Sequence, residues 1–238
     1  MKSKIYLMMC LCMVIGVSVS QATPQVQYLW DSVNYTPASQ GWHVDSTGAS
    51  QTNDTVNQAL AAESTYGYNW RWNKTGAVTN DPTGWTLTAR LEVLSSNTTN
   101  WSVLVGVDTG SNLWNIILNK CSWNDESSGV YTMPGQAFLQ SVPDIYSVFH
   151  TFQIIMAPGE TTPKLYVDGL LNADAVIRNG GGTWLGAGNV IFGSGNSEAV
   201  SSVLWQEVSF ETGVNPIPEP VSISLLGLGA LGLLRRKK

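Results

Sequence analysis

Apolar and polar residues alternate along much of the chain. From Trp85 to Val93 every second residue is apolar, while threonine, arginine and glutamate occupy the positions between them. A period of two predicts a β-strand with one face toward a core. The same criterion predicts further strands at 101–107, where Leu104 is an exception to the alternation, and at 113–118, 150–156, 164–167, 190–192 and 203–210. Residues 56–62 fit either a strand or a short helical turn.

The spacing of these segments indicates the fold class. The expected strands are short and are separated by stretches rich in Gly, Pro, Asn and Asp. A βαβ fold would need amphipathic helices of about 10–15 residues between its strands, and the chain has none. We therefore expect an all-β protein, an antiparallel β-sandwich of the jelly-roll type, formed by one domain over residues 23–212.

One segment predicts a specific turn. Residues 164–171 place Asp168-Gly169 between two apolar runs, which is typical of a type I′ hairpin. Phe149-His150 opens the strand before this hairpin, and apolar strands follow at 190–193 and 205–210. In this order the motifs resemble the concanavalin A-like or laminin-G-like jelly-roll superfamily. The resemblance covers residues 149–210 by motif and 28–148 by strand pattern alone, and it implies a fold rather than a function.

The amino-terminal segment has the pattern of a secretory signal peptide. Lys2 and Lys4 precede an apolar run over residues 5–19, and Ser20-Gln21-Ala22 follows as a small-x-small cleavage pattern. The run is shorter than the roughly 20 residues of a membrane span. We therefore expect residues 1–22 to be removed on export. Cys121 would then be the only cysteine left, so no internal disulfide can form.

The carboxyl-terminal segment has three parts in a fixed order. A Pro-rich linker over residues 213–220 contains Pro218-Glu219-Pro220. Residues 221–238 follow as an apolar Leu- and Gly-rich stretch, which we expect to be a transmembrane sorting helix, and end in a basic cluster. The cluster consists of Arg235, Arg236, Lys237 and Lys238. The order resembles the PEP-CTERM sorting tail of Gram-negative bacteria. An ordinary tail-anchored membrane protein is the alternative.

The resemblance implies a route and a processing partner. It implies that the protein is exported and inserted transiently in the inner membrane, where the basic cluster acts as a membrane stop. An exosortase-type protease would then process the chain near Pro218, Glu219 and Pro220. Bacteria with this system typically make extracellular polysaccharide, so the resemblance also implies delivery to the cell envelope or the extracellular matrix, with polysaccharide as a candidate partner.

Charge excludes one class of partner. The formal net charge of the chain is −5, but residues 23–217 contain six Lys and Arg against 16 Asp and Glu, a net charge of −10. A protein that relies on neutralising phosphates needs a basic surface. We therefore expect no nucleic-acid partner.

The residues suited to catalysis are few and scattered. No Glu-x-Asp sequence occurs, although glycoside hydrolases of this superfamily place paired carboxylates on one strand. His43 and His150 are isolated in the sequence, and His150 is expected to pack or to form hydrogen bonds. We predict no catalytic site, no metal site and no cofactor.

Calcium would suit the acidic body, but no loop has the dense acidic spacing of a dedicated site. The loop carboxylates that remain as candidate calcium ligands are Asp108, Asp125 and Asp174.

Tryptophan is abundant, with ten residues in the chain. Indole faces pack well against the apolar faces of sugar rings. Trp85 and Trp101 follow the apolar register of their strands, so we expect them in the core. Trp70 and Trp72 flank Arg71 and share one strand face, which makes them candidate glycan contacts.

These observations favour an exported, non-catalytic component of the envelope or extracellular matrix. The alternative is a carbohydrate-binding, lectin-like module, which would require an exposed set of sugar-contacting side chains. A glycan hydrolase is the third hypothesis, and it requires two carboxylates that converge on one groove.

Overall fold

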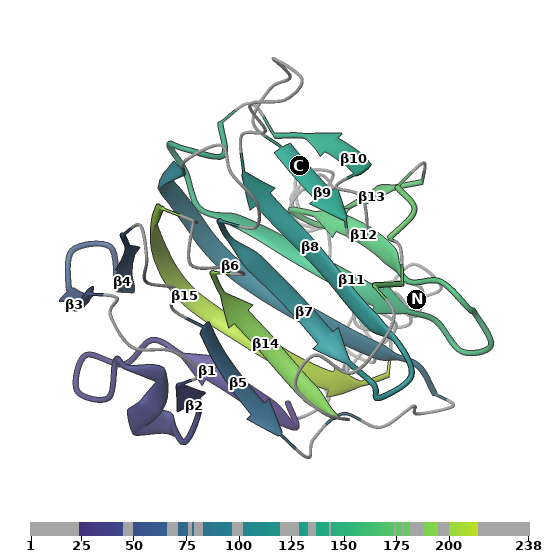
Figure 1. Ribbon diagram of the computed structural model, residues 1–238, viewed down its shortest axis with the longest axis horizontal. Coiled ribbons are helices and arrows are strands. Elements are labelled where there is room, and N and C mark those ends of the chain that lie inside the picture. Colours follow the sequence, from purple (N-terminus) through teal and green to yellow (C-terminus); the bar gives the residue numbers. More distant parts are fainter. Residues whose placement is uncertain are drawn as a thin grey trace, which may run out of the picture.

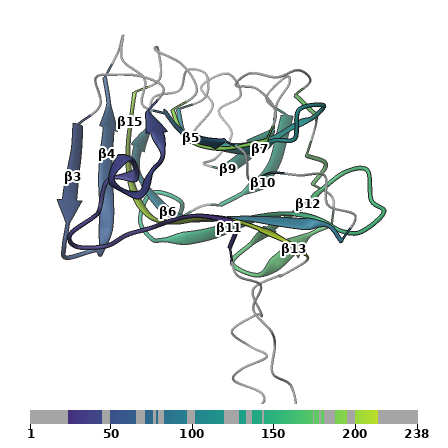
Figure 2. The same ribbon diagram turned by 90° about the horizontal axis from the view of Figure 1, so that it is seen from below.

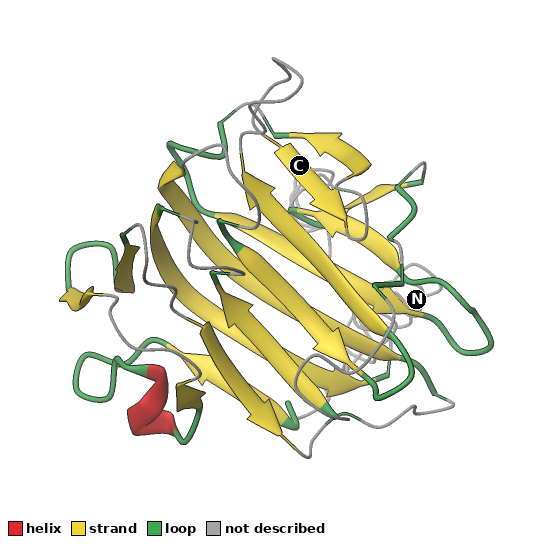
Figure 3. Cartoon of the chain, viewed as in Figure 1, coloured by secondary structure: helices red, strands yellow, loops and turns green. Residues whose placement is uncertain are grey.

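A computed structural model of the chain describes its central region. The described residues are 24–44, 50–65, 71–75, 78, 83–96, 102–119, 129–132, 137–142, 144–173, 175–177, 179–180, 188–194 and 200–213. The predicted signal peptide (1–22) and sorting tail (221–238) lie outside them, as does the predicted linker (213–220) except for Gly213. Strands dominate the described part of the chain, together with the short 3-10 helix η1 (Pro37–Gln40) (Figure 3).

No helix in these ranges combines the length and the apolar composition that crossing a bilayer requires.

Two antiparallel sheets form a sandwich (Figures 1 and 2). The eight-stranded sheet has the order β13 (Leu170–Asn172), β12 (Lys164–Val167), β11 (His150–Met156), β6 (Trp85–Ser96), β15 (Ser201–Thr212), β4 (Ala59–Ser64) and β3 (Ser50–Asp54). Its eighth strand, β1 (Val26–Leu29), pairs with the second half of β15. The seven-stranded sheet has the order β10 (Ala137–Ser141), β9 (Gly129–Thr132), β8 (Leu113–Asn119), β7 (Leu104–Asp108), β14 (Asn189–Gly193), β5 (Arg71–Thr75) and β2 (His43–Val44).

The predicted all-β sandwich is confirmed, and most of the expected strands are present. β11 and β12 coincide with the predicted segments, and β6 extends the predicted strand to Ser96. The apolar residues of β6 face the core as the alternation requires. Of the segment left open between strand and helix (56–62), residues 59–62 belong to strand β4, which pairs with β15 on one side and β3 on the other, and residues 56–58 form the turn that follows β3. Pairing on both edges outweighs the helix propensity of its alanine and leucine residues.

The turn between β12 and β13 confirms the hairpin prediction. Asp168 has a φ of +52° and Gly169 a φ of +83°. Both central residues of a type I′ turn need positive φ, which Asp tolerates better than most residues and Gly adopts without strain. The turn therefore fixes the register in which Val167 pairs with Leu170.

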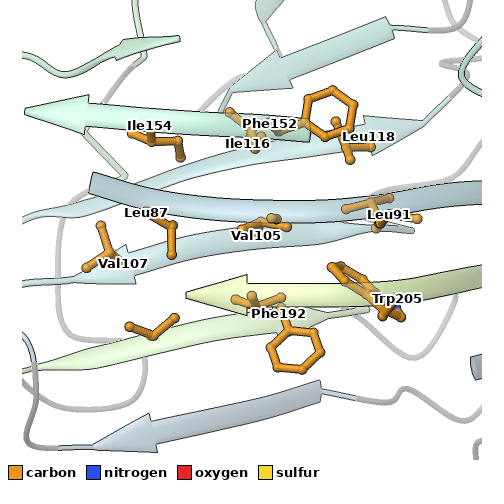
Figure 4. Packing of buried hydrophobic residues seen from close by; sticks show 14 of the residues in the cluster. Leu87, Leu91, Val105, Val107, Ile116, Leu118, Phe152, Ile154, Phe192 and Trp205 are labelled. Atoms are coloured by element: carbon orange, nitrogen blue, oxygen red, sulfur yellow. The ribbon is translucent and has the colours of Figure 1, made fainter. Parts of the chain in front are cut away.

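Aromatic rings fill the space between the two sheets. Phe192 of β14 lies at the centre of this group, with its ring centroid 4.9 Å from those of Trp42, Trp72 and Trp205 and 5.6 Å from that of Tyr28. Figure 4 shows Phe192 and Trp205 beside the aliphatic side chains of the same core. These rings come from both sheets and from the segment before β2, so one residue links several elements that are distant in sequence.

Candidate functional site

The seven-stranded sheet is buried on both of its faces at its central strands. Every residue of β7, β9 and β14 is buried. Val105 and Val107 of β7 belong to the core between the sheets, so the residues that alternate with them point to the outer face. The outer face of an antiparallel sheet is ordinarily solvated. The outer face of this sheet is instead withdrawn from water at its centre.

Part of this outer face is apolar. Leu104 pairs with Ile117, and Ile117 pairs with Tyr131, so these three side chains form a line across β7, β8 and β9. A separate buried cluster, distinct from the main core, consists of Leu104, Leu113, Ile117, Tyr131 and Ile191. The cluster explains why Leu104 breaks the alternation expected for its strand, since a residue on the second face is also buried.

Beside these apolar residues lies a polar group, which we call the acceptor cluster: Asp108, Asn115 and Asn189. Asn189 of β14 is the direct cross-strand partner of Asp108 at the end of β7, so their Cβ atoms lie about 5 Å apart. Asn115 of β8 pairs with Gly106 of β7. Because Gly106 lies two residues before Asp108, Asn115 is the diagonal neighbour of Asp108. The three residues are 0–1% exposed.

Asp108 is only partly satisfied. Its Oδ1 accepts a hydrogen bond from the Gly110 amide at 2.8 Å, and its main-chain oxygen accepts one from the Gly188 amide at 2.9 Å. Within the described part of the chain, the Oδ2 atom of Asp108 and the Oδ1 atom of Asn115 are buried without a hydrogen-bond partner. An unpaired buried acceptor costs about 1–3 kcal/mol, and more when it is charged. The cluster therefore has an unmet demand for hydrogen-bond donors.

The acceptor cluster also lacks a described cationic neighbour. Arg71 and Leu104 both pair with Gly193, so they lie level with each other across the sheet. Asp108 lies four residues, or roughly 13 Å, further along the strand from Leu104. Lys74 pairs with the core residue Val190 and so lies on the opposite face, where its Nζ donates to the Gln40 carbonyl at 3.0 Å. The polar side chains of the cluster are consequently one carboxylate and two neutral amides, with no described cation beside them.

Gly106 sets the position of Asn115. A Cβ atom on Gly106 would lie 2.8 Å from Asn115 Cβ and 3.0 Å from the Trp114 carbonyl oxygen. We expect Gly106→Ala to push Asn115 away from the sheet and to lower the free energy of unfolding by about 1–3 kcal/mol, as overpacking does. Urea denaturation checks this value. Gly159→Ala is the control for a methyl group added without crowding, because nothing lies within 4 Å of the place its Cβ would take, and its loss measures the strain at a φ of +77° alone. A loss below about 1 kcal/mol in Gly106→Ala would contradict the crowding at Gly106.

The prediction that Trp72 contacts a glycan is wrong. Trp72 is 0% exposed and packs on Phe192 between the sheets. The expected strand is present as β5, and Arg71 points away from Trp72 toward the outer face as predicted. Trp72, however, lies on the inner face of the strand, opposite Phe192. The interior of a sandwich this wide needs large side chains, and the indole supplies one. Trp70 lies outside the described residues, as does Trp101, whereas Trp85 is in the core as predicted.

Of the three candidate calcium ligands, the structure describes only Asp108, while Asp125 and Asp174 lie outside the described residues. In the described ranges no group of three or more His, Cys, Asp or Glu side chains could hold a metal ion. Asp108 therefore has amides rather than other carboxylates as its polar neighbours on the sheet.

His150 forms a hydrogen bond, as predicted for it, through Nδ1, which lies 2.7 Å from Asp168 Oδ2. Its Nε2 lies 3.3 Å from Asp144 Oδ1, an ion-pair distance without hydrogen-bond geometry. The other carboxylate oxygen of Asp168 accepts a hydrogen bond from the Thr151 amide at 2.8 Å. The two carboxylates bind opposite sides of one imidazole, so they do not converge on a common substrate position. This arrangement joins the β12–β13 turn to the start of β11.

We expect Asp168→Ala to lower the free energy of unfolding by about 1–3 kcal/mol, because it removes two hydrogen bonds and places alanine at a positive φ. Asp144→Ala should have a smaller effect, since Asp144 is more exposed and its contact with His150 is longer. Thermal denaturation of both variants checks the order. A larger loss for Asp144→Ala would show that the turn is not the anchored element.

Sequence reasoning singled out Asp108 but missed Asn115 and Asn189. Two signals were present. The exception at Leu104 indicates a strand that is buried on both faces, and Asn115 interrupts the otherwise apolar segment 113–118. A polar residue within a fully buried strand needs a partner, so this combination marks a position where a polar contact is required.

Comparisons with known proteins identify the fold. No family model and no curated protein matches the sequence. The carbohydrate esterase vb_24B_21 from the Shiga toxin-encoding bacteriophage phi24B is similar over 81% of this chain and 99% of its own, with a TM-score of 0.56 at 14% identity. Domain 4 of AbnA, an extracellular GH43 arabinanase of Geobacillus stearothermophilus solved with arabinotriose, covers 82% and 95%, with a TM-score of 0.52 at 13% identity.

A third similar structure is the carbohydrate recognition domain of Emp46p in its potassium-bound form. It covers 82% of this chain and 100% of its own, with a TM-score of 0.50 at 11% identity. At such identities the likeness concerns the fold alone. This chain shares with these three structures the fold of an antiparallel β-sandwich.

Proposed function

We propose that this protein is a non-catalytic carbohydrate-binding module and that the acceptor cluster on the outer face of the seven-stranded sheet is its ligand contact. The observation that carries the proposal is the pair of buried acceptors without partners, Asp108 Oδ2 and Asn115 Oδ1. Sugars present several hydroxyl donors on one face, and a few fixed polar groups beside apolar surface are the usual way to orient a small ligand. The apolar outer cluster that ends at Tyr131 lies on the same sheet face as the acceptors and, like them, is buried.

The similar structures support the same proposal. Two of them carry a carbohydrate-directed name, as an esterase and as a recognition domain, and the arabinanase domain was solved with a bound trisaccharide. Catalysis is not part of the proposal. The carboxylates of Asp144 and Asp168 both contact His150, on opposite sides of its ring. A hydrolase would need two carboxylates that face a shared space.

The proposed place of action is the cell envelope or the extracellular matrix. The sequence supports it through the signal-peptide pattern at residues 1–22 and the tail that resembles a PEP-CTERM signal, with Pro218-Glu219-Pro220 as the processing motif. On this proposal an exosortase-type protease is a transient partner, the membrane is occupied only during sorting, and an extracellular polysaccharide is the ligand. Mass spectrometry of the cell-surface protein tests the sorting, and an intact terminus at Lys238 would contradict it.

A glycan array probed with the purified protein, with and without calcium, tests the binding proposal. We expect binding to at least one class of glycan, and we expect it to be lost in Asp108→Asn, which changes one oxygen for an amide nitrogen at nearly constant volume. Glu160→Gln is the matched control. It removes the same charge, and Glu160 is exposed on the turn between β11 and β12. Absence of binding to every glycan, in both conditions, would contradict the proposal.

A further inference from the structure

We propose that the group received by the acceptor cluster is a primary ammonium, so that the ligand is an amino-sugar polysaccharide with free amines rather than a neutral or acidic glycan. This inference rests on the proposed function and specifies its ligand. It follows from the charge, the donor and acceptor balance and the separation of the described side chains on the outer face of the seven-stranded sheet.

The charge of Asp108 is the first argument. The carboxylate is 0% exposed, its one side-chain hydrogen bond comes from the neutral Gly110 amide, and no salt bridge of the described residues involves it. Burying a carboxylate without a cationic partner is costly. A ligand that brings a positive charge removes this cost, whereas a neutral hydroxyl contributes a hydrogen bond without compensating the charge. Hydrogen bonds between charged groups are also roughly twice as strong as neutral ones.

The balance of donors and acceptors is the second argument. Within the described residues, Asp108 Oδ2 and Asn115 Oδ1 are buried acceptors without hydrogen-bond partners, and their residues are diagonal neighbours about 7 Å apart at Cβ. A primary ammonium has three N–H donors on one atom and can serve two acceptors from one position. A hydroxyl has a single donor. The burial of the two acceptors also favours a small terminal group over a complete sugar ring.

A divalent cation fits the same residues less well. Calcium takes six to eight oxygen ligands, commonly with several carboxylates among them. Across the described residues, no group of three metal-binding side chains is present, and the cross-strand and diagonal neighbours of Asp108 are the amides of Asn189 and Asn115. One carboxylate balances the single charge of an ammonium and leaves a calcium ion with an excess of positive charge.

Acidic glycans are disfavoured by the same surroundings. Arg71 lies in another row of the outer face and Lys74 lies on the opposite face, so neither is placed to receive a uronate carboxylate beside Asp108. The domain as a whole repels anions and attracts cations, because residues 23–217 have a net charge of −10. Attraction of a polycationic glycan should therefore weaken at high ionic strength.

Isothermal titration calorimetry with three matched oligosaccharides tests the inference. The ligands are β-1,4-linked glucosamine hexamers, the same hexamers after complete N-acetylation, and hexameric uronates. We expect the amine form to bind at least about tenfold more tightly than the acetylated form, which corresponds to losing one hydrogen bond to a charged group. We expect no binding of the uronates. Acetylation changes only the ligand, so this comparison does not depend on the folding of any variant.

Asp108→Asn and the control Glu160→Gln locate the effect. The preference for the amine form should disappear in Asp108→Asn and remain in Glu160→Gln. Equal affinity for the amine and acetylated forms would overturn this inference and leave the proposed function standing, while no binding of any glycan would overturn both. A preference that persists in Asp108→Asn would overturn the assignment to the acceptor cluster. Calcium chloride titrated alone is the remaining arm, and calcium binding that disappears in Asp108→Asn would identify the site as a metal site instead.

Discussion

Replacing Phe192 by alanine is expected to lower the free energy of unfolding by about 3–5 kcal/mol. The Phe192 ring contacts aromatic rings from both sheets, including Trp72 and Trp205, and is 0% exposed. Tyr28 and Trp42 also contact Phe192, and the four surrounding rings cannot fill the space that the removed phenyl group leaves. A cavity therefore remains, and the free-energy cost of this cavity adds to the lost transfer free energy of the phenyl group. Urea denaturation followed by tryptophan fluorescence measures the change.

Two companion variants make this result specific. Phe192→Leu retains most of the apolar volume and should lose clearly less stability than the alanine variant. Val56→Ala removes apolar atoms from a side chain that is 88% exposed, so its effect should stay within about 0.5 kcal/mol. A loss below about 1 kcal/mol for Phe192→Ala would show that the ring is not central to the packing of the two sheets.

The second large effect is expected at Asp108, and it has two opposite components. Asp108→Asn should abolish glycan binding while it raises the free energy of unfolding of the ligand-free protein by about 1–3 kcal/mol, the range for relieving an unsatisfied buried polar group. The asparagine keeps an oxygen for the Gly110 amide and adds an N–H donor in place of the unpaired carboxylate oxygen. Gains in stability that accompany loss of function are typical of binding sites.

Denaturation of the ligand-free protein and calorimetry with glycan measure the two components separately. Glu160→Gln removes the same charge from an exposed turn and should change neither quantity. If Asp108→Asn destabilised the ligand-free protein, the carboxylate would have a structural role, and its unpaired oxygen would not indicate a binding site.

Much of the fold could be predicted from the sequence because its strands obey simple patterns. The period of two in β6 identified both the strand and its buried face, and Asp168-Gly169 specified the hairpin turn through the φ values it can adopt. Each of these signals is local, so a single segment is sufficient to interpret it. The assignment of strands to two sheets is a different matter, because β6 pairs with β11 and β15, which are far away in the chain.

The candidate site was harder to predict for the same reason. Asp108, Asn115 and Asn189 come from three strands, and only the pairing of β7 with both β8 and β14 brings them together. The misassignment of Trp72 has a related cause. Alternation shows which residues share a face, but it does not show whether that face is inside or outside the sandwich. Trp72 lies opposite Phe192, and that pairing places it inside.

The most direct test of glycan binding at the acceptor cluster is to map the bound glycan on the protein by NMR. In titrations of the isotopically labelled protein with a glycan that binds on the array, we expect the largest amide shifts at Gly106, Asp108, Asn115 and Asn189 on the outer face of the seven-stranded sheet. Amides of the eight-stranded sheet, such as those of Thr88 and Gln153, should change little. Shifts concentrated on the eight-stranded sheet, or none near Asp108 at saturating glycan, would contradict this assignment.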